Sequence, residues 1–188
     1  DEYLAGELKL SECKILDIDT GGVGERYCID LTCLISRGEG MLIGSSASSL
    51  ALVHGEVIES EFVPARPFRV NAGSPHSYIL MADGKTKYLS ELLSGDEIML
   101  ISESGNTRPA TIGRLKIETR PFLRITWQND YQISNSIYLQ QAETVRILAG
   151  SGEAISVTKL KTGDLILCHN SNHTRHIGNK VAITSKEV

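Results

Sequence analysis

The sequence is poor in several features that define large classes of protein. Aromatic residues make up 5% of the chain, and only 5 of its 188 residues are proline. No apolar run approaches the roughly 18 residues that a membrane-spanning helix needs, and no signal peptide is found at the start. We therefore expect no association with a membrane and, by default, a cytoplasmic protein. Because the first residue is Asp1 rather than Met, we also expect that an N-terminal segment is missing.

Positive charge is in deficit. The chain has 19 Lys and Arg against 23 Asp and Glu, which gives a net charge of -4. Surfaces that bind nucleic acid are normally basic. We therefore expect no nucleic-acid partner.

Signature motifs of common cofactor and catalytic sites are also missing. Cys13, Cys28, Cys33 and Cys168 form no C-x-x-C pair and no zinc-type spacing, so we interpret them as small buried apolar residues in a reducing compartment. There is no P-loop, nucleophile elbow or H-E-x-x-H motif. The glycines at 21–24 are interpreted as a turn between short strands, because no helix follows to bind a pyrophosphate. A dinucleotide would have to be bound in an unconventional way or outside this chain.

Short runs rich in β-branched residues dominate what is present. Runs of about four to eight residues between turn residues are typical of strands. The candidates are 14–18, 26–31, 41–43, 50–54, 68–70, 77–81, 97–101, 111–118, 122–127, 136–139, 144–148, 165–168 and 181–184. Helical periodicity is weak, and its best short candidates are 45–52 and 86–93. We therefore predict a mainly β, barrel- or sandwich-like domain with one or two short helices.

The domain contains an internal repeat of strand–turn–strand units. Residues 78–98 and 146–166 share a hydrophobic strand, a glycine turn, spaced apolar residues, a Gly-Asp turn and a second strand, and a fainter copy lies at 31–41. The Gly-Asp pair suits a chain reversal. Asp96 and Asp164 are therefore interpreted as turn residues rather than catalytic acids.

Candidate chemistry is concentrated between residues 54 and 88, which are rich in hydrogen-bond donors for an acidic protein. On a strand, Arg69 and Asn71 would face one side while Phe68 and Val70 face the other. Arginine binds carboxylates in bidentate fashion, asparagine binds hydroxyls, and histidine moves protons near neutral pH. Such a set suits an anionic, polyhydroxylated substrate. The alternative is that the arginines pair with the protein's own carboxylates and that His76 caps a turn.

Two further groups extend this chemistry. Arg175, His176 and Lys180 form a second Arg-His-Lys cluster near the end of the chain. Glu143 and Arg146 are interpreted either as a structural ion pair or as a carboxylate that orients a catalytic side chain.

Several segments together resemble one family. The block 66–80, with Arg66-Pro-Phe-Arg69-Val-Asn71-Ala-Gly-Ser-Pro-His76, is similar to the central signature of the archaeal-type (type II) 3-dehydroquinate synthases. Further similar segments are 38–44, 52–54, 85–92, 113–118, 139–146 and 175–180. They follow the family order over nearly the whole chain. The resemblance implies that residues 1–188 are the C-terminal β-rich domain of such a protein, whose N-terminal half is a further partner.

The resemblance implies two branches of function. Archaeal members use NAD to deaminate and cyclise a small anionic seven-carbon amino sugar acid to 3-dehydroquinate, an early step of the shikimate pathway. Members similar to 3-amino-4-hydroxybenzoate synthases keep the nitrogen, aromatise a related substrate and use a divalent metal ion such as Mn or Mg. A third hypothesis is a non-catalytic β-rich fragment or ligand-binding domain. A homo-oligomer is compatible with each.

We assign roles on the residue types and the resemblance together. The expected substrate-binding residues are Arg66, Arg69, Asn71, Arg175 and Lys180, with the arginines on the carboxylate and Asn71 on an oxyanion or a ring hydroxyl. The expected acid–base residues are His76, His176 and Lys87. The expected metal ligands are His54, Glu56 and Glu143, because mixed histidine and carboxylate sites suit Mn or Mg.

Overall fold

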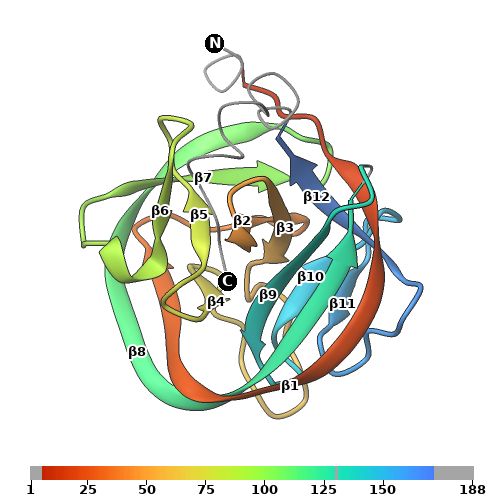
Figure 1. Ribbon diagram of the computed structural model, residues 1–188. Helices are drawn as coiled ribbons and strands as arrows, with labels where there is room; N and C mark the ends of the chain where they lie inside the picture. The colour runs from red at the N-terminus through yellow and green to blue at the C-terminus, as the bar shows by residue number, and fades with distance from the viewer. Residues whose placement is uncertain (1–5, 130, 172–188) are drawn as a thin grey trace.

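A computed structural model describes residues 6–129 and 131–171 of the chain (Figure 1). Almost all of its regular structure is β. The elements are β1 (Ser11–Leu31), β2 (Glu39–Ser46), β3 (Ser49–His54), β4 (Arg69–Gly73), β5 (Tyr78–Leu80), β6 (Thr86–Tyr88), the 3-10 turn η1 (Leu89–Glu91), β7 (Glu97–Ser102), β8 (Thr107–Gln128), β9 (Ser134–Gln140), β10 (Arg146–Leu148), β11 (Ala154–Ser156) and β12 (Leu165–Asn170). The predicted mainly β class is confirmed. The predicted strand 181–184 lies outside the described residues.

All of these strands belong to one antiparallel sheet, in which six pairings return to their starting point. The cycle runs β3-β12-β1-β8-β7-β2 and closes because β2 also pairs with β3. The long strands β1 and β8 lie side by side and curve around the shorter central strands (Figure 1). Of the two predicted arrangements, barrel-like and sandwich-like, the sandwich-like one is confirmed.

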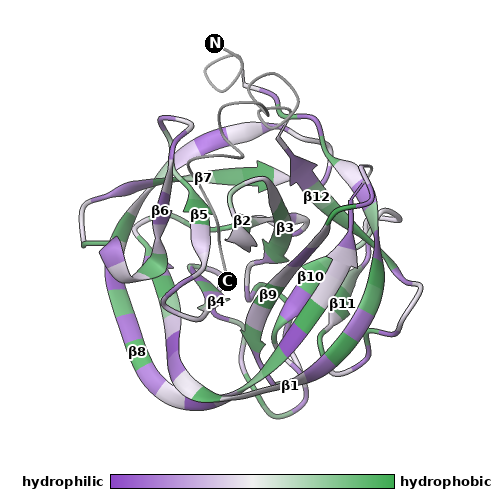
Figure 2. Ribbon diagram, viewed as in Figure 1, coloured by the Kyte–Doolittle hydropathy of each residue, from purple (hydrophilic) through white to green (hydrophobic). Residues whose placement is uncertain are grey.

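Two hydrophobic clusters follow from the alternation of side chains along the central strands. In β2, Met41 and Ile43 belong to the main cluster, whereas Leu42 belongs to the second. The same alternation holds for β3 and β7, so these two strands are buried on both faces. Both are largely green, the colour of hydrophobic residues, in Figure 2. The second cluster also holds Leu80 of β5 and Leu148 of β10. The repeated hairpins therefore cover one face of the central strands.

The internal repeat is real in three dimensions. The hairpin β5–β6 pairs Ile79 with Lys87, and the hairpin β10–β11 pairs Ile147 with Ile155 in the same register. The Gly-Asp turns match too, since Asp96 accepts a hydrogen bond from the Leu93 N–H and Asp164 accepts one from the Lys161 N–H, each at 2.9 Å. Asp96 and Asp164 are turn residues, as predicted.

The fainter third copy shares the same turn. Glu39 accepts a hydrogen bond from the Ser36 N–H at 2.8 Å, and Gly38 has a positive φ like Gly95 and Gly163. A carboxylate that caps the backbone three residues earlier is thus common to all three copies.

Several local predictions were wrong or partly wrong. Residues 45–52 are the hairpin between β2 and β3 rather than a helix, because Leu50 and Leu52 alternate with Ala51 across two buried faces. Residues 86–93 begin as strand β6 and contain only the 3-10 turn η1. The predicted short strands 14–18 and 26–31 are one continuous strand β1, and 111–118 and 122–127 are likewise joined in β8.

The glycines at 21–24 form a β-bulge within β1 rather than a turn. The register with β8 shifts between Thr20 and Val23. A Cβ on Gly21 would lie 3.0 Å from the side chains of both Phe122 and Tyr138. Glycine is needed here because two aromatic side chains pack on the backbone.

Candidate functional site

The site is built on three adjacent strands whose polar residues share one face. Side chains at every second position of a strand point the same way, and cross-strand partners share a face. In this register Asp30 lies between Arg69 and Arg114, Cys28 lies between Asn71 and Lys116, and Arg26 is opposite Glu118. We call this group the polar face; its members are Arg26, Cys28 and Asp30 of β1, Arg69 and Asn71 of β4, and Arg114, Lys116 and Glu118 of β8. The opposite side of β1 and β4 carries core residues such as Ile29 and Val70.

Two carboxylates on this face each hold two arginines. Asp30 accepts hydrogen bonds from Arg69 Nε at 2.7 Å and from Arg69 Nη2 at 3.1 Å, and Arg114 Nη2 lies 2.7 Å from Asp30 Oδ2. Glu118 pairs with Arg26 at 2.7 Å and with Arg120 at 2.9 Å. Four guanidinium groups on two carboxylates leave an excess of positive charge, which favours an anionic ligand.

Three members of these ion pairs are buried. Asp30 is 4% exposed, Arg69 8% and Arg26 6%. Burial alone would raise the pKa of Asp30, but hydrogen bonds from Arg69 and Arg114 outweigh it and hold the pKa below its usual value. Removing one partner of such a buried pair typically costs about 3–5 kcal/mol. Asp30 therefore fixes the position of Arg69.

The segment between β3 and β4 adds Glu56 and Arg66 to the polar face. The Glu56 N–H donates to the carbonyl of Arg69 at 2.8 Å, and the Arg66 N–H donates to the carbonyl of Glu56 at 2.7 Å. The two side chains form a loose ion pair at 4.0 Å, in which Arg66 is 39% exposed. Burial raises the pKa of Glu56, although the charges of Arg69, Arg66 and Arg26 offset part of this effect. A buried carboxyl of this kind can hold or release a proton.

A hydrogen bond between two side-chain amides, those of Asn71 and Gln140, links the polar face to β9. Gln140, the last residue of β9, accepts hydrogen bonds through Oε1 from Arg26 Nη1 and from Asn71 Nδ2, the latter at 2.8 Å. Asn71 is 5% exposed. Sequence reasoning missed Arg26, Asp30 and Glu118 as site residues. The available signal was a strand, 26–31, in which Arg26, Cys28 and Asp30 alternate with apolar residues.

His76 lies beyond the end of β4, next to β9. Its ring packs edge-on against Tyr138 with the centroids 5.1 Å apart. Both residues line a pocket of about 750 Å³ that also contains Arg124 and several serine hydroxyls. Because Tyr138 and Gln140 lie on the same side of β9, this pocket adjoins the side of β9 that contacts Asn71. The structure thus brings Arg66, Arg69 and Asn71 into one group and places His76 near its edge.

Other predicted residues lie elsewhere. Lys87 pairs with Asp96 at 3.2 Å in the Gly-Asp turn of the first full repeat copy.

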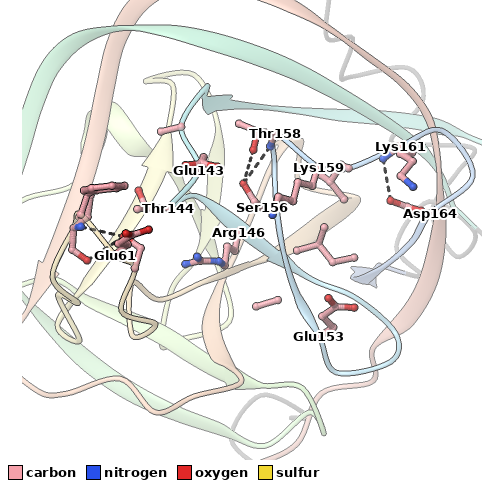
Figure 3. A pocket seen from close by; sticks show the side chains of 17 residues that line it. Glu61, Glu143, Thr144, Arg146, Glu153, Ser156, Thr158, Lys159, Lys161 and Asp164 are labelled. Atoms are coloured by element: carbon pink, nitrogen blue, oxygen red, sulfur yellow. Dashed lines mark hydrogen bonds between the residues drawn. The ribbon is translucent and has the colours of Figure 1, made fainter.

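Glu143 is exposed and lines a larger pocket of about 1100 Å³ with Arg146 and Glu61 (Figure 3). The salt bridges of the described residues do not include a Glu143–Arg146 pair. Arg175, His176 and Lys180 lie outside the described residues.

The larger pocket is less suited to chemistry than the polar face. Its hydrogen bonds serve local turns, for example between the hydroxyls of Ser156 and Thr158 at 2.9 Å (Figure 3). Its acidic and basic side chains are mixed, so its charge favours no particular ligand. We therefore place the candidate site on the polar face.

The predicted metal ligands do not form a site in the described part of the chain. No three His, Cys, Asp or Glu side chains are grouped for a metal ion among residues 6–129 and 131–171. His54 Nε2 accepts a hydrogen bond from the Gly38 N–H at 2.9 Å. Burial, with the charges of Arg146 and Arg37, lowers the pKa of His54 to about 4. We therefore interpret His54 as a neutral structural residue.

Comparison with known proteins identifies the family. Residues 12–187 match the family described as 3-dehydroquinate synthase II C-terminal domain. The chain belongs to this family. It is similar to proteins named 3-dehydroquinate synthase from Methanocaldococcus jannaschii (45% identity, covering 95% of this chain and 49% of the relative) and Methanocorpusculum labreanum (47% identity, 98% and 52%). A third relative of that name, from Nitrosopumilus maritimus, is 45% identical over 92% of this chain and 49% of its own length.

The 3-dehydroquinate synthase II C-terminal domain is thus the unit described above. The chain spans about half the length of the curated relatives it matches. The expected membership and C-terminal position of the chain are confirmed. No helix in the described residues is long and apolar enough to cross a membrane.

Proposed function

We propose that the full-length protein containing this domain is a 3-dehydroquinate synthase II-like enzyme, and that the polar face binds its substrate. The reaction would convert a linear seven-carbon amino keto sugar acid by oxidative deamination and intramolecular carbon–carbon bond formation. The observation that carries the proposal is the group of four arginines held on two carboxylates, which suits the acid group of such a substrate. The names of the relatives agree with it.

Arg66 is the residue we assign to the substrate carboxylate. Its side chain is 39% exposed, and within the described part of the chain its one ion pair is the 4.0 Å contact with Glu56, which leaves its guanidinium available for a bidentate ligand. Arg69 is fixed by Asp30 beneath it and adds positive charge. Anchoring one end of a linear substrate helps to bring its reacting carbon atoms together.

Proton transfer needs a group whose pKa is matched to neutral conditions. Glu56 supports this role, because burial raises its pKa and it adjoins Arg66 and Arg69. We propose Glu56 as a base that removes a proton next to the substrate carbonyl. His76, exposed at the edge of the same region, stays a candidate for returning a proton.

We assign neither of the cofactors that the family resemblance implies to the described residues. The 3-10 turn Leu89–Glu91 is too short to offer a helix N-terminus to a dinucleotide diphosphate, and no metal cluster is found among these residues. We therefore propose no step that passes through NAD or a metal ion on this part of the chain. Either cofactor stays a proposal for the full-length protein.

The test uses the full-length protein and the amino keto sugar acid, with NAD or with Mn²⁺. Absorbance of NADH together with formation of 3-dehydroquinate is the expected result. An aromatic aminohydroxybenzoate product would instead place the protein in the other branch. If neither product formed, the proposed activity would be contradicted.

The carboxylate role of Arg66 has its own prediction. Arg66→Ala should raise KM about tenfold to a hundredfold, because a charge-assisted bidentate contact contributes about 1.5–3 kcal/mol. Arg37→Ala, which removes an exposed arginine outside the polar face, is the matched control and should leave KM unchanged. An unaltered KM in Arg66→Ala would remove Arg66 from the binding site.

A further inference from the structure

Two buried polar atoms of the polar face have no hydrogen-bond partner among the described residues. They are Arg26 Nε, a donor, and Asn71 Oδ1, an acceptor. Both side chains are more than nine-tenths buried. A buried polar group without a hydrogen-bond partner destabilises the fold, because it has lost its hydration without replacement. Two such atoms on residues that share one partner are typical of a site that is completed by a ligand.

The shared partner fixes which atoms are left over. A guanidinium can only donate, so the atom of Gln140 that faces Arg26 must be its carbonyl Oε1. The same Oε1 also faces Asn71, so Asn71 must present its NH₂ group there. The amide orientation of Asn71 is therefore determined by the network, and the unpaired atom is its carbonyl oxygen.

We propose that Arg26, Asn71 and Gln140 form a subsite that binds hydroxyl groups of the polyhydroxylated substrate. The proposal deepens the function proposed above and rests on it. A hydroxyl both donates and accepts, so it can satisfy an acceptor such as Asn71 Oδ1 and a donor such as Arg26 Nε. An ammonium group would be repelled by the Arg26 charge, and a carboxylate would meet the carbonyl dipole of Asn71.

This assignment narrows the role of Asn71. The sequence suggested either an oxyanion or a ring hydroxyl as its ligand. The Asn71 NH₂ group donates one of its two N–H groups to Gln140, and the atom left without a partner is the acceptor Oδ1, which needs a donor such as a hydroxyl rather than an oxyanion. The subsite therefore binds hydroxyl groups, and Arg26 and Gln140 contribute to substrate specificity.

The experiment measures binding rather than turnover. Isothermal titration calorimetry on the full-length protein would compare quinate, in which the ketone of 3-dehydroquinate is replaced by a hydroxyl, with analogues that each lack one hydroxyl. Wild type should bind one of these analogues at least about tenfold more weakly than quinate, because a buried polar atom is then left unpaired.

The decisive variant is Asn71→Leu, which keeps the size of the side chain and removes both polar atoms. It should bind quinate and that one analogue with equal affinity, whereas a purely structural role would weaken both ligands by the same factor. Asn106→Leu, the same change in the exposed turn between β7 and β8, should retain the wild-type preference. If Asn71→Leu does not fold, Gln140→Met at a half-buried position releases the same two side chains and should also reduce the preference.

The outcomes separate the two proposals. If quinate binds and Asn71→Leu keeps the full preference of wild type, the subsite holds only water and our inference is overturned, while the proposed function stands. If wild type binds neither quinate nor 3-dehydroquinate, the proposed function fails and the inference fails with it.

Discussion

Asp30 illustrates how single residues organise the site. Its carboxylate lies on the same strand face as Arg26, and it aligns Arg69 from β4 with Arg114 from β8. The arrangement works because alternate residues of β1 face opposite sides, so a strand that contributes to the core also presents charge. Charged residues buried in this way need partners, and each partner here comes from a different strand.

The residue-scale prediction concerns Glu56. Burial raises its folded-state pKa above that of the unfolded chain. Between these two pKa values the folded state holds the extra proton, so the stability of the wild type should fall as pH rises. Glu56→Gln should remove this decline and should be more stable than wild type near neutral pH.

Urea unfolding across about pH 4 to 8 measures this effect. Glu97→Gln, at an exposed position at the start of β7, is the control and should follow wild type. If the unfolding free energy of the wild type instead rises between pH 5 and 8 relative to that of Glu56→Gln, the neighbouring arginines stabilise the Glu56 carboxylate.

At the scale of elements, the site depends on how closely β4 approaches β9. Gly73 ends β4 with φ +99°, and a Cβ there would lie 2.1 Å from the carbonyl oxygen of Tyr138. Asn71 contacts Gln140 through the same approach. Glycine therefore lets two backbones meet where the side chains of the amide network converge.

Gly73→Ala tests this approach. Gly95→Ala is the matched control, because Gly95 has φ +97° but no atom within 4 Å of its Cβ position. Both variants should lose about 1–3 kcal/mol of unfolding free energy from backbone strain. Gly73→Ala should lose clearly more, measured by urea unfolding, because backbone must also move. Equal losses would mean that the contact with Tyr138 relaxes without cost.

At the scale of the whole molecule, the closed cycle of six strands shares one main hydrophobic cluster. Trp127 of β8 is fully buried in it, and its indole N–H donates to Ser49 of β3 at 2.9 Å. Strands from early and late parts of the chain thus depend on one another. The domain should therefore unfold as a single unit.

The fluorescence of Trp127, the only tryptophan in the chain, reports this directly. Its unfolding transition in urea should coincide with that of the far-ultraviolet circular dichroism signal. Two separated transitions would show that the repeated hairpins and the long strands fold as distinct units.

Local chemistry made much of the fold predictable. β-branched runs between turn residues located most strands, and the Gly-Asp turns at Asp96 and Asp164 were found because turns depend on near neighbours. Helix 45–52 was wrong because short apolar runs look alike whether they are helical or buried on two strand faces. Arg66, Arg69 and Asn71 were recognised as one group because they are close in sequence.

The sequence by itself determined the mainly β class, the repeat and the family, because these depend on residue patterns that are read along the chain. Only the tertiary structure decided which side chains meet. Arg26, Asp30, Glu118 and Gln140 come from three strands distant in sequence, and pairing register alone brings them to Arg69 and Asn71. The same register separated Lys87 and Glu143 from that group. The low content of proline and aromatic residues does not predict such contacts, because the contacts depend on how the strands pair rather than on composition.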